Sequence, residues 1–373
     1  MKKTRTLAFL LSMMATITFA LPAKAQAREA YVARSTDGQT ITFYYDNQKA
    51  ARSSEGSVWG IQETKGEAGN YSPTWSGTYD NPEQTLLKAV FDASFRDYRP
   101  TNTGQWFRYC ARLHIIEGLE NLNTENVTDM YGMFYGCKAL AKLDLSTFNT
   151  GKVTNMSEMF YGCKALAKLD LSTFNTGKVT NMYAMFDGCT ALTTLGLSTF
   201  NTENVTDMRG MFAYCKALAK IDLSTFNTEN VTDMGGMFYG CEALAKIDLS
   251  TFNTKNVTDM SDMFFGCTAL TTIYCNDDWN HGVTESGDIF RDNTKLKGAV
   301  AYDAAKTGVE MANPTTGYFT KKDNTAISQA SITEDTAARA IYTTDGKQAK
   351  RIQAGLNILR MNDGTTRKIV RKQ

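Results

Sequence analysis

The sequence has very little histidine and almost no net charge. Of its 373 residues only His114 and His281 are histidines, so one chain cannot build a metal site from several imidazoles. The same scarcity leaves few candidates for a histidine general base, which disfavours an enzyme. Lys and Arg number 40 against 39 Asp and Glu, and this balance argues against bulk electrostatic binding to nucleic acid or anionic lipid.

Long apolar runs are also absent, except at the N-terminus. Lys2, Lys3 and Arg5 precede an apolar stretch over 7–21, and Ala23-Lys24-Ala25 follows as a cleavage site. This order is typical of a secretory signal peptide, here residues 1–25. No cysteine follows the stretch before Cys110, so attachment as a lipoprotein is not expected. We predict an exported protein, secreted or held at the outer cell surface, without a membrane-spanning segment after signal removal.

A 26-residue unit repeats through the middle of the chain. Its pattern is V-T-[DN]-M-x-x-M-F-x-x-C-x-A-L-x-x-[LI]-x-L-S-T-F-N-T-x-[KN], and chance cannot produce such in-register copies. Six cysteines mark the same position of successive units: Cys137, Cys163, Cys189, Cys215, Cys241 and Cys267.

Two hydrophobic periodicities occur inside each unit. Met156, Met159, Phe160 and Cys163 have the i, i+3, i+4, i+7 spacing of one face of a two-turn helix, with Asn155 and Glu158 as a capping box. Leucines that alternate with Lys and Asp, as in 168–171, predict a short strand. Because one unit cannot bury its apolar residues alone, the units must stack. We therefore predict an α/β solenoid of about eight 26-residue coils, each with a short strand and a short helix.

The repeat divides the chain into five parts. After the signal peptide, residues 26–86 form an N-terminal cap region with a strand at 40–45, and residues 87–320 form the repeat array with its C-terminal cap. Residues 321–340 are polar and indicate a linker. Residues 341–373 have two Asp-Gly turn signals between apolar strands, at 345–346 and 363–364, and predict a small basic β module.

The repeat unit resembles the BspA-like leucine-rich-repeat surface proteins. The likeness covers about 40–320, and the segment from Val90-Phe91-Asp92 to Asp97-Tyr98-Arg99-Pro100 is similar to members from Bacteroidetes. The Asn or Cys that leucine-rich repeats place three residues after the last leucine is replaced by Phe174, which puts the turn geometry in doubt. The resemblance implies adhesion to host matrix proteins, plasma proteins or other bacteria.

The C-terminal module carries a second, shorter resemblance. Gly346, Gly355-Leu356-Asn357-Ile358 and Lys368-Ile369-Val370 are similar to the sorting signals of the type IX secretion route. This likeness implies the secretion and sorting machinery as a partner of the module.

The cysteine and methionine columns could suggest thiol chemistry or copper(I) binding. Each cysteine, however, lies on an apolar face beside Met and Phe, where a small buried hydrophobe is the simpler interpretation. Packed helices lie about 8–10 Å apart, too far for a disulfide between neighbouring coils. We predict free, buried thiols, no metal and no cofactor.

The polar positions of the predicted strands form two adjacent solvent-exposed columns, one mainly of Lys and one mainly of Asp. The columns are interrupted by neutral residues at 194 and 196 and at 272 and 274. Such a surface is either a self-neutralising solvated ladder or a protein-binding strip, and Lys between the Asp residues argues against Ca²⁺. We define the strip by ten residues: Lys142, Asp144, Lys168, Asp170, Thr194, Lys220, Asp222, Lys246, Asp248 and Tyr274.

Three functions remain open at this point. The first is a repeat protein that binds protein ligands over an extended surface, as an adhesin would. The second is a passive surface coat or scaffold. The third is a glycan-active enzyme, for which Asp144 and Asp170 could provide two carboxylates at the required separation of about 5–10 Å. Their environments are alike, so the division into acid and base that hydrolysis needs is missing.

Overall fold

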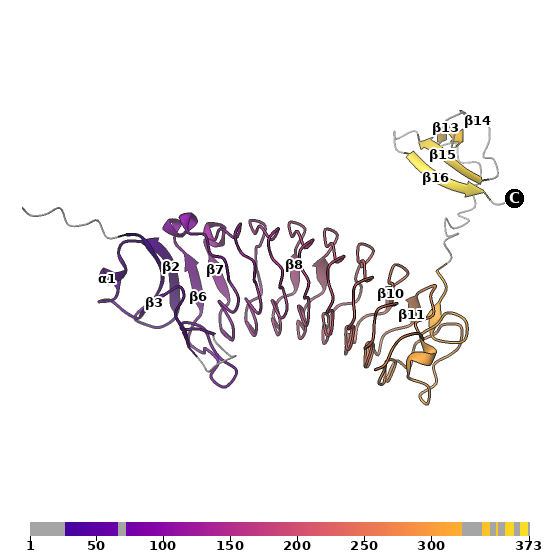
Figure 1. Cartoon of the computed structure of the whole chain (residues 1–373), viewed down its shortest axis with the longest axis horizontal. Coiled ribbons are helices and arrows are strands. Elements are labelled where there is room, and N and C mark those ends of the chain that lie inside the picture. Colours follow the sequence, from indigo (N-terminus) through magenta and orange to yellow (C-terminus); the bar gives the residue numbers. More distant parts are fainter. Residues whose placement is uncertain are drawn as a thin grey trace, which may run out of the picture.

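The computed structural model describes residues 27–65 and 72–322, and the backbone of four further strands between 338 and 371. The expected signal peptide and most of the expected linker, 323–337, lie outside the described residues. Residues 100–300 form a row of stacked coils, with an N-terminal sheet at one end (Figure 1).

The N-terminal sheet has five strands in the order β3-β1-β2-β6-β7. β1 and β2 pair antiparallel, whereas β2, β6 and β7 pair in parallel, so the sheet changes from a hairpin to the parallel pairing of the repeats. This one sheet therefore crosses the boundary at 86/87 between the expected cap and the expected array. The strands are β1 (Glu29–Arg34), β2 (Thr40–Asp46), β3 (Val58–Gly60), β6 (Lys88–Phe91) and β7 (Ile115–Glu117).

Short elements surround this sheet. They are α1 (Lys49–Arg52), the antiparallel pair β4 (Thr64–Lys65) and β5 (Ser72–Pro73), and the 3-10 helices η1 (Ala93–Asp97) and η2 (Leu119–Asn121). Aromatic rings fill the core under the sheet, where Phe43 stacks on Phe91 with 4.4 Å between ring centroids. Trp106, from the first coil, stacks on Phe43 at 5.4 Å, so the cap and the array share one core.

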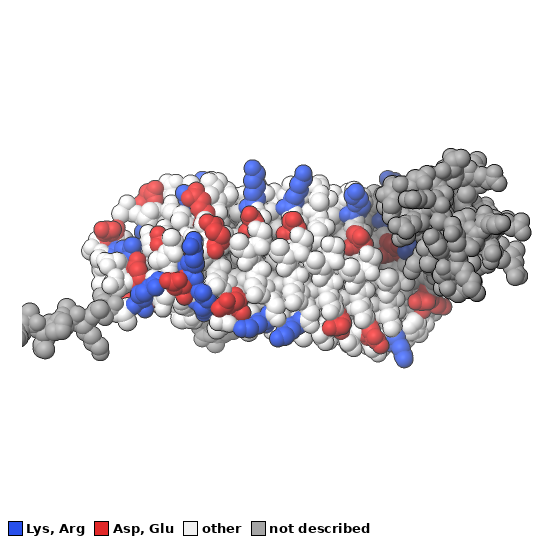
Figure 2. All heavy atoms as spheres, turned by 90° about the horizontal axis from the view of Figure 1, so that it is seen from above, with Lys and Arg blue, Asp and Glu red and all other residues white. Residues whose placement is uncertain are grey.

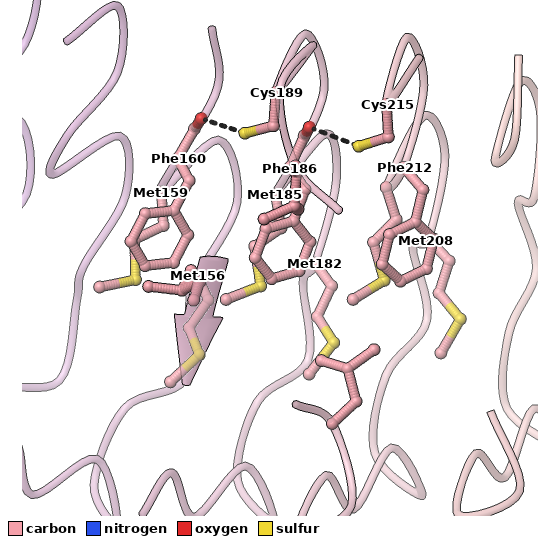
Figure 3. Close-up of a cluster of buried hydrophobic side chains, with 14 of the residues drawn as sticks. Met156, Met159, Phe160, Met182, Met185, Phe186, Cys189, Met208, Phe212 and Cys215 are labelled. Carbon is pink, nitrogen blue, oxygen red and sulfur yellow. Dashed lines mark hydrogen bonds between the residues drawn. The ribbon is translucent and has the colours of Figure 1, made fainter. Parts of the chain in front are cut away.

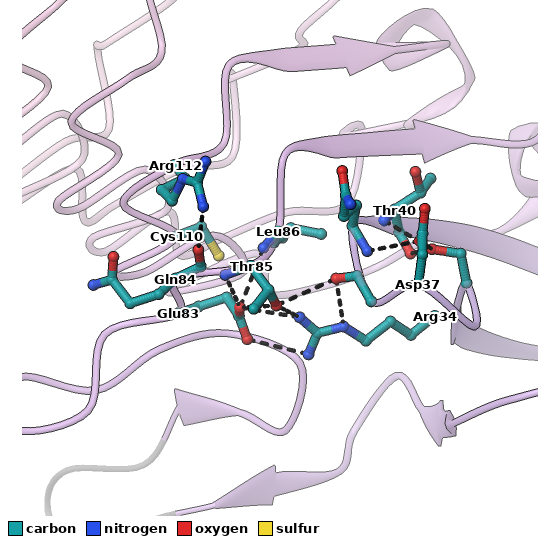
Figure 4. A network of polar contacts seen from close by, with 12 residues as sticks. Arg34, Asp37, Thr40, Glu83, Gln84, Thr85, Leu86, Cys110 and Arg112 are labelled. Atoms are coloured by element: carbon teal, nitrogen blue, oxygen red, sulfur yellow. Dashed lines mark hydrogen bonds and ion pairs between the residues drawn. The ribbon is translucent and has the colours of Figure 1, made fainter.

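A polar clamp holds the loop before β6 against the cap (Figure 4). The Arg34 guanidinium contacts both carboxylate oxygens of Glu83, at 3.1 and 3.0 Å, and also the Thr85 hydroxyl. The Thr85 N–H donates to the same carboxylate at 2.7 Å. Burial raises the pKa of Glu83, but the hydrogen bonds from Arg34 and Thr85 outweigh it and lower the pKa to about 2.

The expected α/β solenoid, with one helix in every coil, is wrong. The described coils contain no α-helix, and their regular strands are only two or three residues long. They are β8 (Lys168–Asp170) and β9 (Thr194–Gly196), then β10 (Lys246–Asp248), β11 (Thr272–Tyr274) and β12 (Phe319–Thr320), with the 3-10 helix η3 (Val309–Met311) before β12. All neighbouring pairs among these strands are parallel.

Backbone conformation explains why the Met-x-x-Met-Phe-x-x-Cys segment is not helical. In the coil of 155–163, Glu158 and Gly162 have φ of +55° and +66°, in the left-handed region that ends a right-handed helix. The Asn155 side chain accepts from the Ser157 N–H at 3.0 Å, so it closes a turn and forms no capping box with Glu158. The segment is two successive turns, and a glycine precedes the cysteine in most coils.

The backbone hydrogen bonds of this segment run between coils. The N–H groups of Met156, Glu158, Phe160 and Gly162 donate to carbonyl groups of the next coil at 2.6–3.1 Å. The N–H groups of Met159, Tyr161 and Cys163 donate three residues back within the coil. A continuous row of parallel bridges results from this stacking: Asn102, Asp129, Asn155, Asn181, Asp207, Asp233, Asp259 and Glu285.

The apolar positions of the repeat form continuous buried columns (Figure 3). Phenylalanine rings from Phe107 to Phe290 stack with 5.5–5.9 Å between neighbouring centroids and interplanar angles of 11° or less. The methionines beside them are fully buried. The predicted burial of Met, Phe, Cys and Leu is confirmed, although no helix carries them.

All eight cysteines are free and buried, as predicted. The argument from helix spacing was wrong, because parallel bridges bring neighbouring coils to about 4.8 Å, within disulfide range. The six thiols of the repeated column instead donate to the phenylalanine carbonyl groups of the preceding coil. Cys189 Sγ, for example, lies 3.1 Å from the Phe160 oxygen, and Cys215 Sγ lies 3.2 Å from the Phe186 oxygen (Figure 3).

The C-terminal module is a four-stranded antiparallel sheet in the order β14-β13-β15-β16. Its strands are β13 (Ala338–Thr343), β14 (Gln348–Ala349), β15 (Gly355–Met361) and β16 (Thr366–Arg371). β15 and β16 pair from Gly355↔Arg371 to Arg360↔Thr366, across the second Asp-Gly signal of the sequence.

Candidate functional site

The predicted strip lies on the surface of the coils, along the short parallel strands. Eight of its ten residues are exposed, whereas Asp248 and Tyr274 are half-buried. Pairing of β8 with β9 places Lys168 beside Thr194, and pairing of β10 with β11 places Asp248 beside Tyr274. The structure therefore brings the strip residues of neighbouring coils into adjacent positions.

The aspartates of the strip have a structural task in each coil. Asp144 Oδ1 accepts from the Ser146 N–H at 2.9 Å, and Asp170 and Asp222 make the same turn with Ser172 and Ser224. These hydrogen bonds from the backbone and the serine hydroxyl lower the pKa of each of the three carboxyl groups. The carboxylates are thus charged and fixed, with one oxygen committed to the turn.

Asp248 differs because it also pairs with a residue beyond the last coil. Lys322, which follows β12, contacts the Asp248 carboxylate and the Ser250 hydroxyl. Burial raises the pKa of Asp248, but the hydrogen bonds from Lys322 and Ser250 lower it by more, so the net shift of the pKa is downward. The strip is therefore closed by an ion pair at its C-terminal end.

Two shallow hollows adjoin each other near the N-terminal end of the strip. The first, of about 240 Å³, is lined by Lys142, Asp144 and Glu120 with apolar neighbours such as Leu119. The second, also of about 240 Å³, lies between Asp144 and Asp170 and includes Ser172. Both hollows are open to solvent.

A ridge of small polar residues lies next to the strip and was not singled out from the sequence. Each S-T-F-N-T segment buries its Phe and second Thr and turns Ser, the first Thr and Asn outward. Figure 2 shows an uncharged band along this part of the molecule, bordered on both sides by charged side chains. The repeat sequence could have predicted this ridge, since these positions are polar and uncharged in each of the five clear copies. The ridge residues of the five clear copies are Ser146, Thr147, Asn149, Ser172, Thr173, Asn175, Ser198, Thr199, Asn201, Ser224, Thr225, Asn227, Ser250, Thr251 and Asn253.

A second unanticipated surface follows the turns beside the cysteine column. Tyrosine rings of neighbouring coils pack together there: Tyr135 stacks on Tyr161 with 4.4 Å between centroids, and Tyr109 packs edge-on against Tyr135 at 4.8 Å. Burial raises the pKa of Tyr135 and that of Tyr161. The first residue after Met-Phe forms most of this surface, and it varies among Tyr, Asp, Ala and Phe.

Other candidate groups are dispersed. His114 and His281 are both exposed and lie at opposite ends of the array. Across 27–65 and 72–322, no three His, Cys, Asp or Glu side chains are grouped so that they could hold a metal ion. No helix in that part of the chain has the length and apolar character to cross a membrane.

Comparison with known proteins places the repeat array in a family. Residues 101–195 and 188–302 match a family model described as Mycoplasma protein of unknown function, DUF285. The two matches run together from 101 to 302, more than half of the chain. No curated protein matches significantly, and neither does any solved structure. The match agrees with the repeat-protein part of the predicted resemblance to BspA-like proteins, and we conclude that this chain belongs to the DUF285 family.

Proposed function

We propose that the protein is an exported, surface-associated repeat protein that binds protein ligands over the strip and the adjoining ridge, as an adhesin does. The carrying observation is the long exposed face on which charged columns border an uncharged Ser/Thr/Asn ridge (Figure 2). Hydroxyl and amide groups at fixed spacing can hydrogen-bond an extended partner, and the charged borders set its orientation.

The interruptions in the strip are the favoured contact points. At Thr194 and Gly196 the Lys and Asp of the neighbouring coil are replaced by small neutral groups, and at Tyr274 by a half-buried aromatic ring. Tyrosine offers a large contact area at low conformational cost, and interfaces are enriched in it. Ligands in this proposal are host matrix or plasma proteins or proteins on other bacteria.

The carboxylates of the strip support binding better than hydrolysis. Asp144 and Asp170, which share one hollow, each have a pKa lowered by the same contact to the serine two residues on. A glycosidase needs one carboxyl group whose environment keeps its proton. The two like environments favour recognition without covalent chemistry.

The tail and the N-terminus support export. The sequence of 1–25 has the order of a signal peptide, and the β module resembles a type IX sorting signal of Bacteroidetes. If the tail acts in this way, deletion of 341–373 traps the protein in the periplasm. Normal delivery of the shortened chain to the cell surface contradicts the sorting role.

Binding of the purified chain to immobilised matrix and plasma proteins tests the main proposal. The aspartates hold turns, so the informative change is Lys220→Glu with Lys246→Glu, which inverts two exposed charges and leaves the turns intact. We expect at least a fivefold loss of affinity. Lys138→Glu with Lys164→Glu is the matched control, because it makes the same charge change outside the strip.

Two outcomes contradict the proposal. Equal binding by the strip variant and the unchanged protein removes the strip as the contact surface. Absence of binding to every matrix, plasma and bacterial surface protein favours a passive coat.

A further inference from the structure

A lysine of this chain already binds to one coil of the strip. Lys322 follows β12, and its ammonium group contacts the Asp248 carboxylate and, at 3.2 Å, the Ser250 hydroxyl. In the strand order β10-β11-β12, Asp248 ends the strand farthest from β12, so the lysine side chain reaches back past the intervening coil. Both charged side chains are 44% exposed. The contact therefore lies on the outer surface of the coils, where a partner could make the same contact.

The aspartate and serine that receive Lys322 recur in other coils. In each copy, Oδ1 of the aspartate accepts from the N–H of the serine two residues on, at 2.9–3.1 Å. Among the residues that the structure describes, the aspartates of the other three copies have no ion pair. We name the four copies the acceptor pairs: Asp144 with Ser146, Asp170 with Ser172, Asp222 with Ser224, and Asp248 with Ser250.

The first two acceptor pairs also have space for a ligand. The hollow of about 240 Å³ between neighbouring coils is lined by both of these pairs. Pairing of β8 with β9 puts Gly196 beside Asp170, whereas pairing of β10 with β11 puts Tyr274 beside Asp248. The carboxylate of Asp170 is accordingly exposed, and that of Asp248 is half-buried. A side chain from outside can reach two carboxylates here without displacing any residue of the protein.

The hydrogen bonds of the turn favour an ammonium group over a guanidinium group. Arginine owes its strong pairing with carboxylates to two parallel hydrogen bonds, one to each oxygen. In the acceptor pairs Oδ1 already accepts from the serine N–H, so a guanidinium group would compete with the turn. The compact ammonium group of lysine has three donors, which one carboxylate oxygen and one hydroxyl can accept. Lys322 uses this arrangement at Asp248 and Ser250.

We propose that the hollow between the first two acceptor pairs binds an exposed lysine side chain of a partner protein. The ammonium group would contact Asp170 Oδ2 and the Ser172 hydroxyl as Lys322 contacts Asp248 and Ser250, with Asp144 as the second carboxylate. This inference rests on the proposed function, since it assigns the chemistry with which the strip recognises a protein ligand. Proteins that present lysine on an exposed loop or extended segment fit the site.

An NMR titration of the isotope-labelled full chain with acetyl-Gly-Lys-Gly-amide tests the proposal. The amide signals of Ser146 and Ser172 report on binding, because these N–H groups bond to the two carboxylates of the hollow. The matched peptides carry acetyl-lysine, which has lost the charge, or arginine. We expect lysine to bind at least fivefold more tightly than acetyl-lysine and at least twofold more tightly than arginine. Equal affinity for lysine and acetyl-lysine, or a preference for arginine, overturns the proposal.

Asp170→Asn locates the site without breaking the turn. Asparagine can accept the same hydrogen bond, as Asn155 does from the Ser157 N–H at 3.0 Å. We expect this variant to bind the lysine peptide at least threefold more weakly. The matched control is Asp259→Asn, because Asp259 makes the same turn with Ser261 outside the strip. It should leave the titration of the Ser172 signal unchanged. Unchanged binding by Asp170→Asn overturns the assignment, and the remaining amide signals show that each variant is folded.

Lys322→Met tests the acceptor pair itself. Removal of the ammonium group frees the pair at 248, so the lysine peptide should shift the Ser250 amide signal in this variant and not in the unchanged protein. A Ser250 signal that stays insensitive in the variant overturns the role of the pair. The proposed function is tested separately by Lys220→Glu with Lys246→Glu. If that variant loses its protein ligands while the lysine and acetyl-lysine peptides bind alike, the lysine site is overturned and the binding role of the strip stands.

Discussion

Thr150 and Asn175, in neighbouring coils, exchange two hydrogen bonds. The buried Thr150 hydroxyl donates to the Asn175 carbonyl oxygen at 2.9 Å and accepts from the Asn175 N–H at 2.8 Å. The same exchange joins Thr176 to Asn201 and Thr202 to Asn227. Each threonine thus replaces a pair of backbone bonds at the turn where the strands have ended.

Thr176→Val tests this exchange. Valine has nearly the same shape and removes both bonds, so the Asn201 backbone groups lose their partner. We expect the free energy of unfolding to fall by about 1–3 kcal/mol, measured by urea denaturation. Thr147→Val, at an exposed ridge position, is the control and should change stability by less than about 0.5 kcal/mol. Equal effects of the two substitutions contradict a structural role for the buried hydroxyls.

Left-handed backbone positions give a second prediction. Gly188 has φ of +70°, and a Cβ there would lie 3.4 Å from the Gly162 Cα. Gly188→Ala should cost about 1–2 kcal/mol, because an L-residue is strained in this region. Asp292→Gly, at φ of +65° in the equivalent position of the last coil, should be neutral or stabilising in the same thermal melts. Destabilisation by both changes contradicts the conformational explanation.

These left-handed glycines explain why the helix predicted from the sequence is absent. The spacing of Met156, Met159, Phe160 and Cys163 matches a helix face, and the structure buries all four residues as that spacing predicts. The backbone differs, because Gly162 takes a left-handed conformation and the N–H groups that a helix would satisfy internally bond to the next coil. Hydrophobic periodicity predicts which side chains are buried, but it does not predict the hydrogen-bond partners of the backbone N–H groups.

The candidate sites differ in how far the sequence could reveal them. The exposure of Lys142 and Lys168 follows from alternation with buried leucines. The aromatic surface beside the cysteine column could not be predicted in this way, because it depends on which rings of neighbouring coils lie together. Only the stacking of coils brings Tyr135 onto Tyr161 and Tyr239 onto Phe265, and the repeat pattern treats those positions as variable.

The cysteine column gives a third prediction, on reactivity. Burial raises the pKa of Cys163 to about 12, and each thiol of the column donates to a carbonyl group of the preceding coil. Because the thiolate is the reactive form, a maleimide or disulfide reagent should label the native protein slowly and the urea-unfolded protein rapidly. Rapid labelling of several cysteines in the native state contradicts the buried column.

The Arg34–Glu83 clamp gives a fourth prediction, on acid stability. The folded-state pKa of Glu83, about 2, lies below the ordinary glutamate value of 4.5. The clamp therefore contributes stability above pH 4.5, and this contribution is lost as the pH falls from 4.5 through 2. We expect Glu83→Gln to lower the free energy of unfolding by about 2 kcal/mol at pH 7, with partial exposure of the pair taken into account.

The sign of the pH effect separates a charged clamp from simple packing. At pH 2 about half of the folded-state glutamate is protonated. Most of the charge contribution is then lost, so Glu83→Gln and the unchanged protein should approach equal stability in urea titrations. Glu125→Gln is a suitable control, because its pair with Arg99 is exposed, with side chains 50% and 38% accessible. An exposed pair contributes about 0–1 kcal/mol, so that variant should stay close to the unchanged protein at both pH values. If Glu83→Gln lowers the free energy of unfolding equally at pH 7 and pH 2, the Glu83 side chain stabilises the fold through its packing and not through its charge.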